Sequence, residues 1–237
     1  MLDGAAVTEV AAEVGVSPES VHAWVARYRE AGLAGHRPAA ASRGSRPSAE
    51  DMVPRVSPEP WLPIETARLR LRRLVPGDLA ALHAIQSRED VTRWLYWDPR
   101  NEDEVRAGIE AHIARPSDQG LVLAIDLDGE LIGTVNVAVG EHRQGEIGFM
   151  LHPDHQGHGY ATEAAEAIVE LAFGTYGLHR VCASVEPRNT ASVRVLERLG
   201  MRKEAQLIEN DWVKGEWSSE AVYAILAREW RAARECG

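Results

Sequence analysis

One stretch of the sequence, IGFMLHPDHQGHGYATEAAEAIVELAF, constrains the fold more than any other. An apolar run from Ile147 to Leu151 meets Pro153, and a loop with Gly157 and Gly159 then precedes a helical apolar pattern. Glycine adopts backbone conformations that other residues avoid, and it lets a ligand come close to the backbone. A helix N-terminus presents unpaired N–H groups and a partial positive charge. The stretch therefore predicts a strand, a loop and a helix whose N-terminus can bind an anion such as phosphate.

The surrounding patterns predict an α/β (α+β) domain with a mixed sheet built largely from hairpins. Asp128-Gly129 joins two apolar runs, which is the strongest short signal for a β-hairpin. Asn101 followed by Glu104 is a capping-box pattern that starts a helix. We expect strands near residues 67–74, 121–127, 130–139, 145–151, 180–186, 204–213 and 219–225. We expect helices from Asp78, from Asn101, over 161–176 and between a cap at Asn189 and Gly200.

The composition divides the chain into three parts. Residues 36–61 are rich in Pro, Ser, Ala and Gly and poor in large apolar residues. Such a segment cannot bury enough apolar surface to offset its ordering entropy, so we interpret it as a flexible linker. It separates a small helical module at residues 1–35 from a domain at residues 62–231, which has an ordinary single-domain size.

Charge and cysteine content argue against several classes of protein. The formal net charge of −10 is poor for broad binding to nucleic-acid phosphates. It suits a cationic partner such as an amine, although it is also ordinary for a soluble protein. Two cysteines, Cys182 and Cys236, make no disulfide framework, which predicts a reducing, cytoplasmic location. We expect no membrane span and no signal peptide, because long apolar runs and a basic N-terminus are both missing.

The glycine loop can be compared with three known phosphate-binding motifs. A P-loop needs Lys and Ser/Thr after its second glycine, and this chain lacks them. A dinucleotide fingerprint needs a third Gly or Ala where this chain has Thr162, and Pro153 separates the loop from the strand. The third pattern, Gln/Arg-x-x-Gly-x-Gly/Ala, is met in full by Gln156, Gly159 and Ala161.

The third pattern resembles the acetyl-CoA site of the GCN5-related N-acetyltransferases, the GNAT family. The segments TARLRLRRL, VEPRNTASVRVLERLGM and YAILAREW are similar to the ribosomal-protein N-acetyltransferase (RimJ/RimL-like) branch, in the right order and spacing. The resemblance covers about residues 62–231. It implies a cytoplasmic acyltransferase with the GNAT fold, whose sheet is splayed at the CoA site, and it implies no metal.

The resemblance also implies which residues bind acetyl-CoA. Pantetheine would lie along the open edge of the first strand, and the pyrophosphate would lie on the N–H groups of the glycine loop. The implied cofactor-binding residues are Phe149, Met150, Leu151, Gln156, Gly157, His158, Gly159, Tyr160, Ala161 and Asn189. An ordinary strand-to-helix turn that uses glycine for positive φ is the alternative for the loop.

Acetyl transfer from a thioester needs a neutral amine, a polarised carbonyl and a stabilised leaving thiolate. The resemblance implies that Ser192, three residues after Asn189, faces the thioester sulfur; its alternative role is in the helix cap. Asp211 is the first candidate for the base and Glu146 is its rival, and either is alternatively a solvated surface carboxylate. The related branch often has an acidic residue four after the tail glycine, where this chain has Ser219 and then Glu220.

The sequence leaves the identity of the acceptor amine open. An α-amino group titrates near 7.7–8.0, so a protein N-terminus needs only a weak base. A small amine such as an aminoglycoside or a polyamine is the alternative acceptor. The segment RWLYWDP places Trp94 and Trp97 either in the core or against a cationic substrate. A homodimer is also compatible with such a domain.

Two further sequence patterns, the loop histidines and the N-terminal segment, each allow two interpretations. His152, His155 and His158 have a spacing that invites a metal, yet Pro153 breaks any helix that would align them, so we expect exposed loop histidines. The N-terminal segment resembles the helix-turn-helix of transposases and regulators. Five arginines against six acidic residues in the first fifty argue against phosphate contacts. We expect a fused remnant or a partner-docking arm, with a DNA-binding, CoA-sensing regulator as the alternative.

Overall fold

A computed structural model describes residues 61–235 of the chain. The helical module predicted at residues 1–35, and the linker predicted at residues 36–61 except for its last residue, lie outside the described residues. Within residues 61–235, no helix has the length and apolar character needed to cross a membrane.

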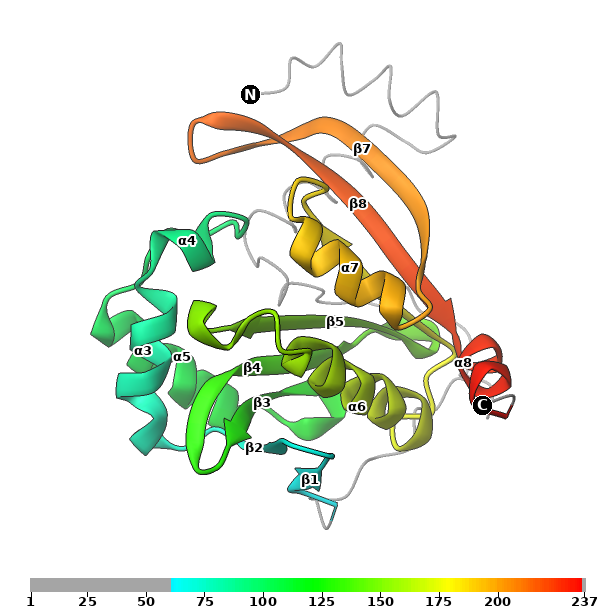
Figure 1. Ribbon diagram of the computed structural model, residues 1–237, viewed down its shortest axis with the longest axis horizontal. Helices are drawn as coiled ribbons and strands as arrows, with labels where there is room; N and C mark the ends of the chain where they lie inside the picture. Colours follow the sequence, from blue (N-terminus) through cyan, green and yellow to red (C-terminus); the bar gives the residue numbers. More distant parts are fainter. Residues whose placement is uncertain (1–60, 236–237) are drawn as a thin grey trace, which may run out of the picture. The chain divides into compact units, whose positions relative to one another are not determined.

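The described domain is built on one eight-stranded sheet (Figure 1). Its strands lie in the order β1-β2-β3-β4-β5-β6-β8-β7, and every neighbouring pair is antiparallel except β5 and β6. The strands are β1 Ile64–Glu65, β2 Arg70–Arg73, β3 Gly120–Leu127, β4 Glu130–Val139, β5 Gln144–Leu151, β6 Arg180–Val185, β7 Arg202–Val213 and β8 Glu216–Leu226. The mixed sheet predicted from the hairpin patterns is therefore confirmed.

Helices connect these strands and cover them. The α-helices are α3 Leu79–Gln86, α4 Glu89–Thr92, α5 Glu102–Ala114, α6 Tyr160–Gly174, α7 Thr190–Arg198 and α8 Ala227–Glu235. Short 3-10 turns are η2 Pro76–Asp78, η3 Ser117–Gln119, η4 Glu141–Arg143 and η5 Pro153–His155. The sequence patterns did not predict the short helix α4 or the C-terminal helix α8.

The β3–β4 turn and the start of α5 form as their sequences predict. Asp128 and Gly129 have positive φ angles of 54° and 91°, as a tight two-residue hairpin turn requires. The side chain of Asn101 accepts a hydrogen bond from the Glu104 amide at 3.0 Å, and the Glu104 carboxylate accepts one from the Asn101 amide at 2.8 Å. The reciprocal pair satisfies two N–H groups that a helix start otherwise leaves unpaired.

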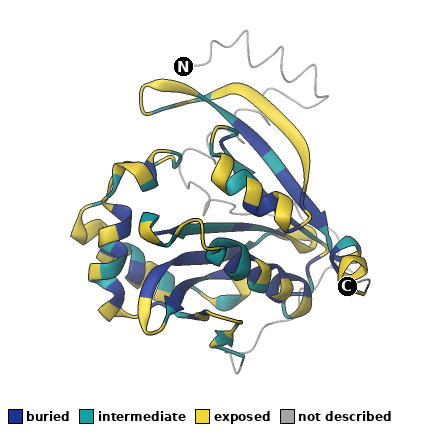
Figure 2. Ribbon diagram, in the orientation of Figure 1, coloured by how far each residue is buried: buried dark blue, intermediate teal, exposed yellow. Residues whose placement is uncertain are grey.

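Helices lie on both faces of the sheet, each over its own core (Figures 1 and 2). The larger core joins the strands to α6, α7 and α8, and the smaller core joins them to α3 and α5. In β5, Ile147 and Leu151 are buried in the larger core, whereas Met150 packs against the smaller one. Because side chains alternate along a strand, Glu146 lies on the same face as Met150, the face covered by α3 and α5.

The sheet opens between β5 and β6. Their parallel pairing covers Gln144 to Glu146 on β5 and Arg180 to Cys182 on β6, and it stops there. Both strands continue, β5 to Leu151 and β6 to Val185, while β4 remains paired with β5 up to Leu151. Among the described residues, the side of β5 away from β4 therefore has no strand neighbour beyond Glu146. We call this opening the fork.

Candidate active site

The glycine loop ends β5 and begins α6. Gly157 and Gly159 have positive φ angles of 80° and 84°, so the backbone here favours glycine. A Cβ atom added to Gly157 would meet no atom within 4 Å, so the space in front of it is open. The Glu163 amide makes a hydrogen bond to the Gly159 carbonyl at 3.0 Å. The N–H groups before Glu163 in the helix have no helical acceptor, so they can bind an anion, as the sequence predicted.

Arg68 holds the glycine loop against the sheet. Its guanidinium donates to the His158 carbonyl at 2.9 Å and to the Glu163 carboxylate at 2.7 Å, and it stacks 4.6 Å from the centre of the Tyr160 ring. Burial alone would raise the pKa of Glu163, but hydrogen bonds from Thr66 and Arg68 lower it below its usual value. The sequence patterns did not predict a role for Arg68, because its partners lie about ninety residues away in the chain.

We expect Arg68→Ala to weaken acetyl-CoA binding by about tenfold, which corresponds to about 1.4 kcal/mol. The loop would lose the contacts that fix its conformation before the ligand arrives, so binding would have to order it. Calorimetric titration with acetyl-CoA measures the change. Arg70→Ala is the matched control, since exposed Arg70 lies two residues further along and pairs with Glu65. Equal affinities in all three proteins would show that the clamp does not contribute to binding.

Glu146 lies at the last paired position of the fork, opposite Cys182 on β6. Burial first, and then the charge of Glu220 on β8, raise the pKa of Glu146 to about 7, although a hydrogen bond from the Ser184 backbone lowers it. A carboxyl group with such a pKa both accepts and releases a proton near neutral pH. Perturbed carboxyl groups of this kind concentrate at active sites.

Ser192 lies in the first turn of α7. Its amide donates to the Asn189 side chain at 3.2 Å, so Asn189 caps this helix as predicted. The Ser192 side chain itself is half-buried, and among residues 61–235 its hydroxyl has no hydrogen-bond partner. The hydroxyl therefore does not take part in the cap and is available to a ligand.

Asp211 lies near the far end of β7, two strands beyond β6, opposite Ser218. Its carboxylate accepts a hydrogen bond from the Trp212 amide at 2.9 Å. The structure thus does not bring Asp211 to the fork where Glu146 lies. The carboxylate with a raised pKa is the rival candidate of the sequence analysis rather than the first one.

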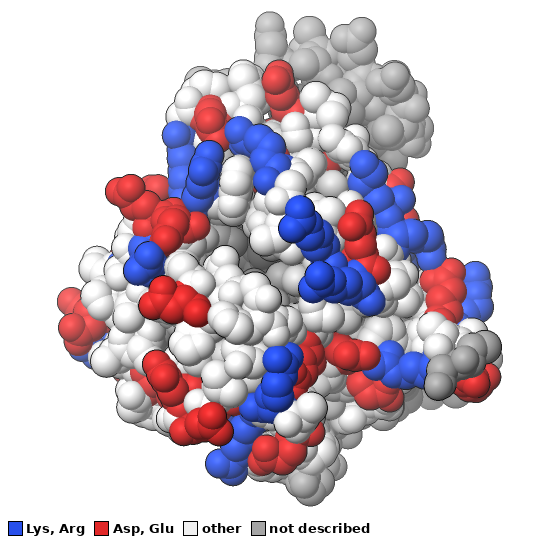
Figure 3. Space-filling model, viewed as in Figure 1, with Lys and Arg blue, Asp and Glu red and all other residues white. Residues whose placement is uncertain are grey.

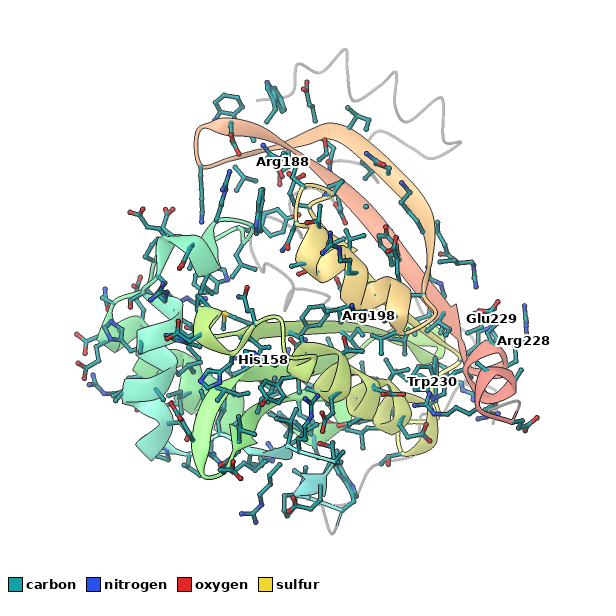
Figure 4. The ribbon with its side chains drawn as sticks, in the orientation of Figure 1. His158, Arg188, Arg198, Arg228, Glu229 and Trp230 are labelled. Atoms are coloured by element: carbon teal, nitrogen blue, oxygen red, sulfur yellow. The ribbon has the colours of Figure 1, made fainter. Side chains whose placement is uncertain are left out.

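Three segments that lie far apart in the chain meet one another beyond the end of β6. Lys214, in the β7–β8 turn, donates to the Thr92 carbonyl at the end of α4 at 2.7 Å. Arg188, after β6, lies 5.4 Å from the centre of the Trp94 ring and also binds Glu186 at 2.9 Å. Figure 4 shows Arg188 between α7 and the β7–β8 hairpin, and His158 in the loop before α6. Figure 3 shows the surface hollowed between α4 and α7.

Both tryptophans predicted to contact substrate are half-buried and already stacked with arginine. Arg93 lies 4.6 Å from the centre of the Trp94 ring, and Arg100 lies 4.3 Å from that of Trp97. Their role in holding a cationic acceptor stays a prediction. Trp94 contributes to the wall beside the fork through its contact with Arg188.

Glu186, beside Arg188 and Trp94, is ionised near neutral pH. Burial alone would raise its pKa, but hydrogen bonds from Arg188 and Ser218 lower it to about 2. The Ser218 hydroxyl donates to its carboxylate at 2.7 Å. Glu186 therefore fixes the position of Arg188 and has no function as a proton acceptor near neutral pH.

The remaining predicted cofactor residues line the open edge of β5 and the loop. Phe149, Met150 and Leu151 form the end of β5, and the Gln156 side-chain amide donates to the Leu151 carbonyl at 3.3 Å. His158 and Tyr160 stack with ring centres 5.7 Å apart.

The loop histidines do not come together as metal ligands. His152 accepts a hydrogen bond from the Asp154 amide at 3.3 Å, and its ring meets that of His155 edge-on at 6.1 Å. Within the described part of the chain, no three His, Cys, Asp or Glu side chains form a group that could hold a metal ion.

Comparison with protein-family models gives two matches. A model described as an acetyltransferase (GNAT) domain matches residues 68–202. A model described as a helix-turn-helix domain matches residues 1–47. The helix-turn-helix resemblance of the N-terminal segment is thus confirmed at the level of sequence, without bearing on whether it binds DNA.

Two kinds of curated relative are similar to the chain. The N-acetyltransferase YnaD of Bacillus subtilis is 34% identical over 70% of this chain and 98% of its own length. The spermidine N(1)-acetyltransferase of Escherichia coli is 25% identical over 69% of this chain and 89% of its own length.

Solved structures share the fold. A GNAT-family acetyltransferase from Bacillus anthracis has a TM-score of 0.64 at 30% identity, covering 70% of this chain and 99% of its own. A Vibrio cholerae spermidine N-acetyltransferase with CoA and spermine has a TM-score of 0.62 at 24% identity, with 70% and 99% coverage. RimL, a ribosomal L7/L12 α-N-protein acetyltransferase with CoA, has a TM-score of 0.63 at 19% identity, with 68% and 95% coverage.

Proposed function

This chain belongs to the acetyltransferase (GNAT) family and is an acyltransferase, and on that premise we propose that it moves an acetyl group from acetyl-CoA to a primary amine. The observation that carries the proposal is the fork. Pairing between β5 and β6 ends at Glu146, and β5 continues to the glycine loop at the N-terminus of α6. An open strand edge, unpaired helix N–H groups and a half-buried carboxyl group thus belong to one strand–loop–helix unit.

The fork and the loop fit acetyl-CoA by their chemistry. The N–H groups from Gly157 to Ala161 would bind the pyrophosphate, and the open edge of β5 at 149–151 would pair with the pantetheine amides. The open space in front of Gly157 supports this fit. When bound, acetyl-CoA supplies an activated acetyl thioester.

Glu146 is the proposed base. Its carboxylate would take one proton from the acceptor ammonium, which leaves a neutral amine. The amine nitrogen would then form the new bond to the acetyl carbon as the bond from that carbon to sulfur breaks, and the second proton that the nitrogen loses would pass to the leaving thiolate. A backbone N–H near Met150 would donate a hydrogen bond to the acetyl oxygen. The Ser192 hydroxyl would donate a hydrogen bond to the leaving sulfur.

We expect Ser192→Ala to lower turnover roughly tenfold while acetyl-CoA affinity stays nearly constant, because the hydroxyl acts on charge that develops at the sulfur only during transfer. Steady-state kinetics and calorimetric titration measure the two quantities. Thr190→Ala, an exposed hydroxyl in the same helical turn, is the control. If Ser192→Ala turns over as fast as the Thr190 variant, Ser192 has no part in the mechanism.

We propose a protein N-terminal α-amine as the acceptor, as in the RimJ/RimL-like branch. Proton transfer is most efficient when donor and acceptor have similar pKa values. The pKa of Glu146 is raised to about 7, and that of an α-amine lies near 7.7–8.0, whereas that of an alkylamine such as Lys lies near 10.4. The α-amine is therefore the better match.

A polyamine is the second candidate. The net charge of the chain is −10, and an acidic surface favours a cationic acceptor. The spermidine enzymes among the relatives support this alternative.

An acceptor panel tests the proposal. The full chain is supplied with acetyl-CoA and with peptides that carry a free N-terminus, the same peptides with a blocked N-terminus and an internal lysine, or spermidine. We expect the highest kcat/KM for free N-termini. A higher value for spermidine would transfer the assignment to a polyamine, and acetylation of none of the three would reject the acceptor class.

A further inference from the structure

The side chain of Asn136 on β4 lies over the neighbouring strand β5 at the fork. Asn136 pairs with Gly148, two residues beyond Glu146, where the pairing of β5 with β6 ends. A Cβ atom added to Gly148 would lie 2.8 Å from Asn136 Oδ1 and 3.5 Å from its Nδ2. The Asn136 amide therefore occupies the space that a side chain at position 148 would fill, on the part of β5 whose other edge is open.

Asn136 and Glu146 are diagonal neighbours on one face of the sheet. Glu146 pairs with Ala138 on β4, and Asn136 is two residues before Ala138. Paired residues of neighbouring strands point to the same face, and so do alternate residues of one strand. Diagonal neighbours are typically about 7–8 Å apart, so a ligand atom between the two side chains can contact both.

Asn136 lies at the margin of the smaller core. In the row of paired residues before it, Ala124 and Met150 belong to that core, and Thr134 between them is buried. In the next row, Asn136 and Gly148 are both half-buried. A ligand can therefore reach the Asn136 amide, whereas the side chains of the preceding row are covered.

The Asn136 amide has no partner within residues 61–235, where its side chain makes no hydrogen bond. An asparagine side chain carries two N–H donors and an oxygen with two lone pairs, and leaving such groups unpaired costs free energy. Asn101 and Asn189 cap helices, but Asn136 lies inside a strand, where asparagine is disfavoured. A bound ligand would supply the partner that the described chain does not.

We propose that Asn136 is an acceptor-binding residue, whose side-chain oxygen accepts a hydrogen bond from the amine that Glu146 deprotonates. The inference rests on the proposed function, in which Glu146 takes one proton from the acceptor ammonium. The neutral amine keeps two N–H groups, and its lone pair must point to the acetyl carbon. A hydrogen bond from one of these N–H groups to Asn136 fixes that orientation.

Asn136→Ala and Gly148→Ala test this role. Asn136→Ala removes the amide, whereas Gly148→Ala displaces it, because the new Cβ atom would lie 2.8 Å from Oδ1. The displaced atom is the end of a flexible side chain, so the strand can accommodate the change. Gly148→Ala therefore tests the contact even if Asn136→Ala does not fold. Asn210→Ala is the matched control, since it removes an amide from an exposed position on β7.

The first measurement is calorimetric titration of each protein, saturated with CoA, with a peptide that has a free N-terminus and with spermidine. CoA carries no acetyl group, so acceptor binding is measured without turnover. We expect Asn136→Ala and Gly148→Ala each to weaken acceptor binding roughly tenfold, the loss of about one hydrogen bond. The double variant should bind no more weakly than Asn136→Ala, because both changes remove the same contact.

The second measurement is the pH dependence of kcat/KM for the acceptor. Its acid limb reports the base of the free enzyme. We expect the limb to stay in place in Asn136→Ala while the plateau falls, because Asn136 contacts the amine and does not act through Glu146. Affinity for CoA should also be unchanged.

Acceptor binding as tight in Asn136→Ala as in Asn210→Ala would overturn the inference. So would additive losses in the double variant, or an acid limb that moves in Asn136→Ala. Each of these results leaves acetyl transfer by the wild-type chain intact. Failure of the proposed function would instead appear as no turnover of any amine by the wild-type chain.

Discussion

Glu146→Gln is expected to lower kcat/KM for the acceptor by about 10²–10³-fold at pH 8, the loss typical of a general base. Glutamine keeps the shape of the side chain and cannot accept the proton. Acetyl-CoA affinity should change little, because Glu146 lies on the face of β5 opposite α6. Steady-state kinetics and calorimetric titration separate the two quantities. Glu141→Gln, which removes an exposed carboxylate in the turn before β5, is the control.

The pH dependence gives the same prediction a second readout. The base must be ionised to accept a proton, and the pKa of Glu146 is raised to about 7. The wild-type rate should therefore fall tenfold per unit as pH decreases below about 7 and should level off above it. Below pH 7 an α-amine acceptor with a pKa near 7.7–8.0 stays mostly protonated, so the acid limb of the pH–rate profile reports the enzyme. If the acid limb of the pH–rate profile is unchanged in Glu146→Gln, another group is the base, and Asp211 is the next candidate.

Local sequence patterns predicted the elements of the fold well, because each depends on residues that are close in the chain. The hairpin turn at Asp128-Gly129 needs two positive φ angles, and the sequence supplies the residues that adopt them. The capping pair Asn101 and Glu104 and the cap at Asn189 are interactions within one helical turn. The glycine loop belongs to the same class, since Gly157 and Gly159 mark backbone conformations that other residues avoid.

Asp78 illustrates where local patterns fail. The sequence predicts a helix beginning near it, and α3 does begin at Leu79. The Asp78 side chain, however, makes no capping hydrogen bond to α3 and instead accepts one from the Val75 amide at 2.8 Å. It is buried and forms an ion pair with Arg72 at 2.8 Å. The pattern predicts the helix correctly, and a contact between two different elements decides the role of the side chain.

The missed parts of the site are contacts of this second kind. Arg68 contacts the glycine loop across about ninety residues of the chain, and Lys214 contacts Thr92 across 122 residues. The length of the fork is also invisible in the sequence, because β5 and β6 continue as strands after their pairing stops. The sequence could therefore name Glu146 as a candidate base, and only its place on the strand beside the fork separates it from Asp211.

Gly159→Val is expected to weaken acetyl-CoA binding by more than tenfold, which corresponds to more than about 1.4 kcal/mol. A Cβ atom at this position would lie 3.4 Å from the Arg68 guanidinium that holds the loop, and the rest of a valine side chain would crowd the N–H groups that begin α6. Gly159 also has a φ angle of 84°, so a β-branched residue strains the backbone whether or not a ligand binds there. The experiment must therefore separate strain from blocked access.

Gly177→Val provides that separation. Gly177 follows the other end of α6, has a φ angle of 60°, and a Cβ atom added to it meets no atom within 4 Å. Both variants should lose stability in thermal unfolding, because both force a β-branched residue to positive φ. Calorimetric titration with acetyl-CoA, with NADH as a nucleotide control, should show weakened binding in Gly159→Val alone. Wild-type affinity in Gly159→Val would refute the anion site at the glycine loop, and equal losses in both variants would attribute the effect to strain.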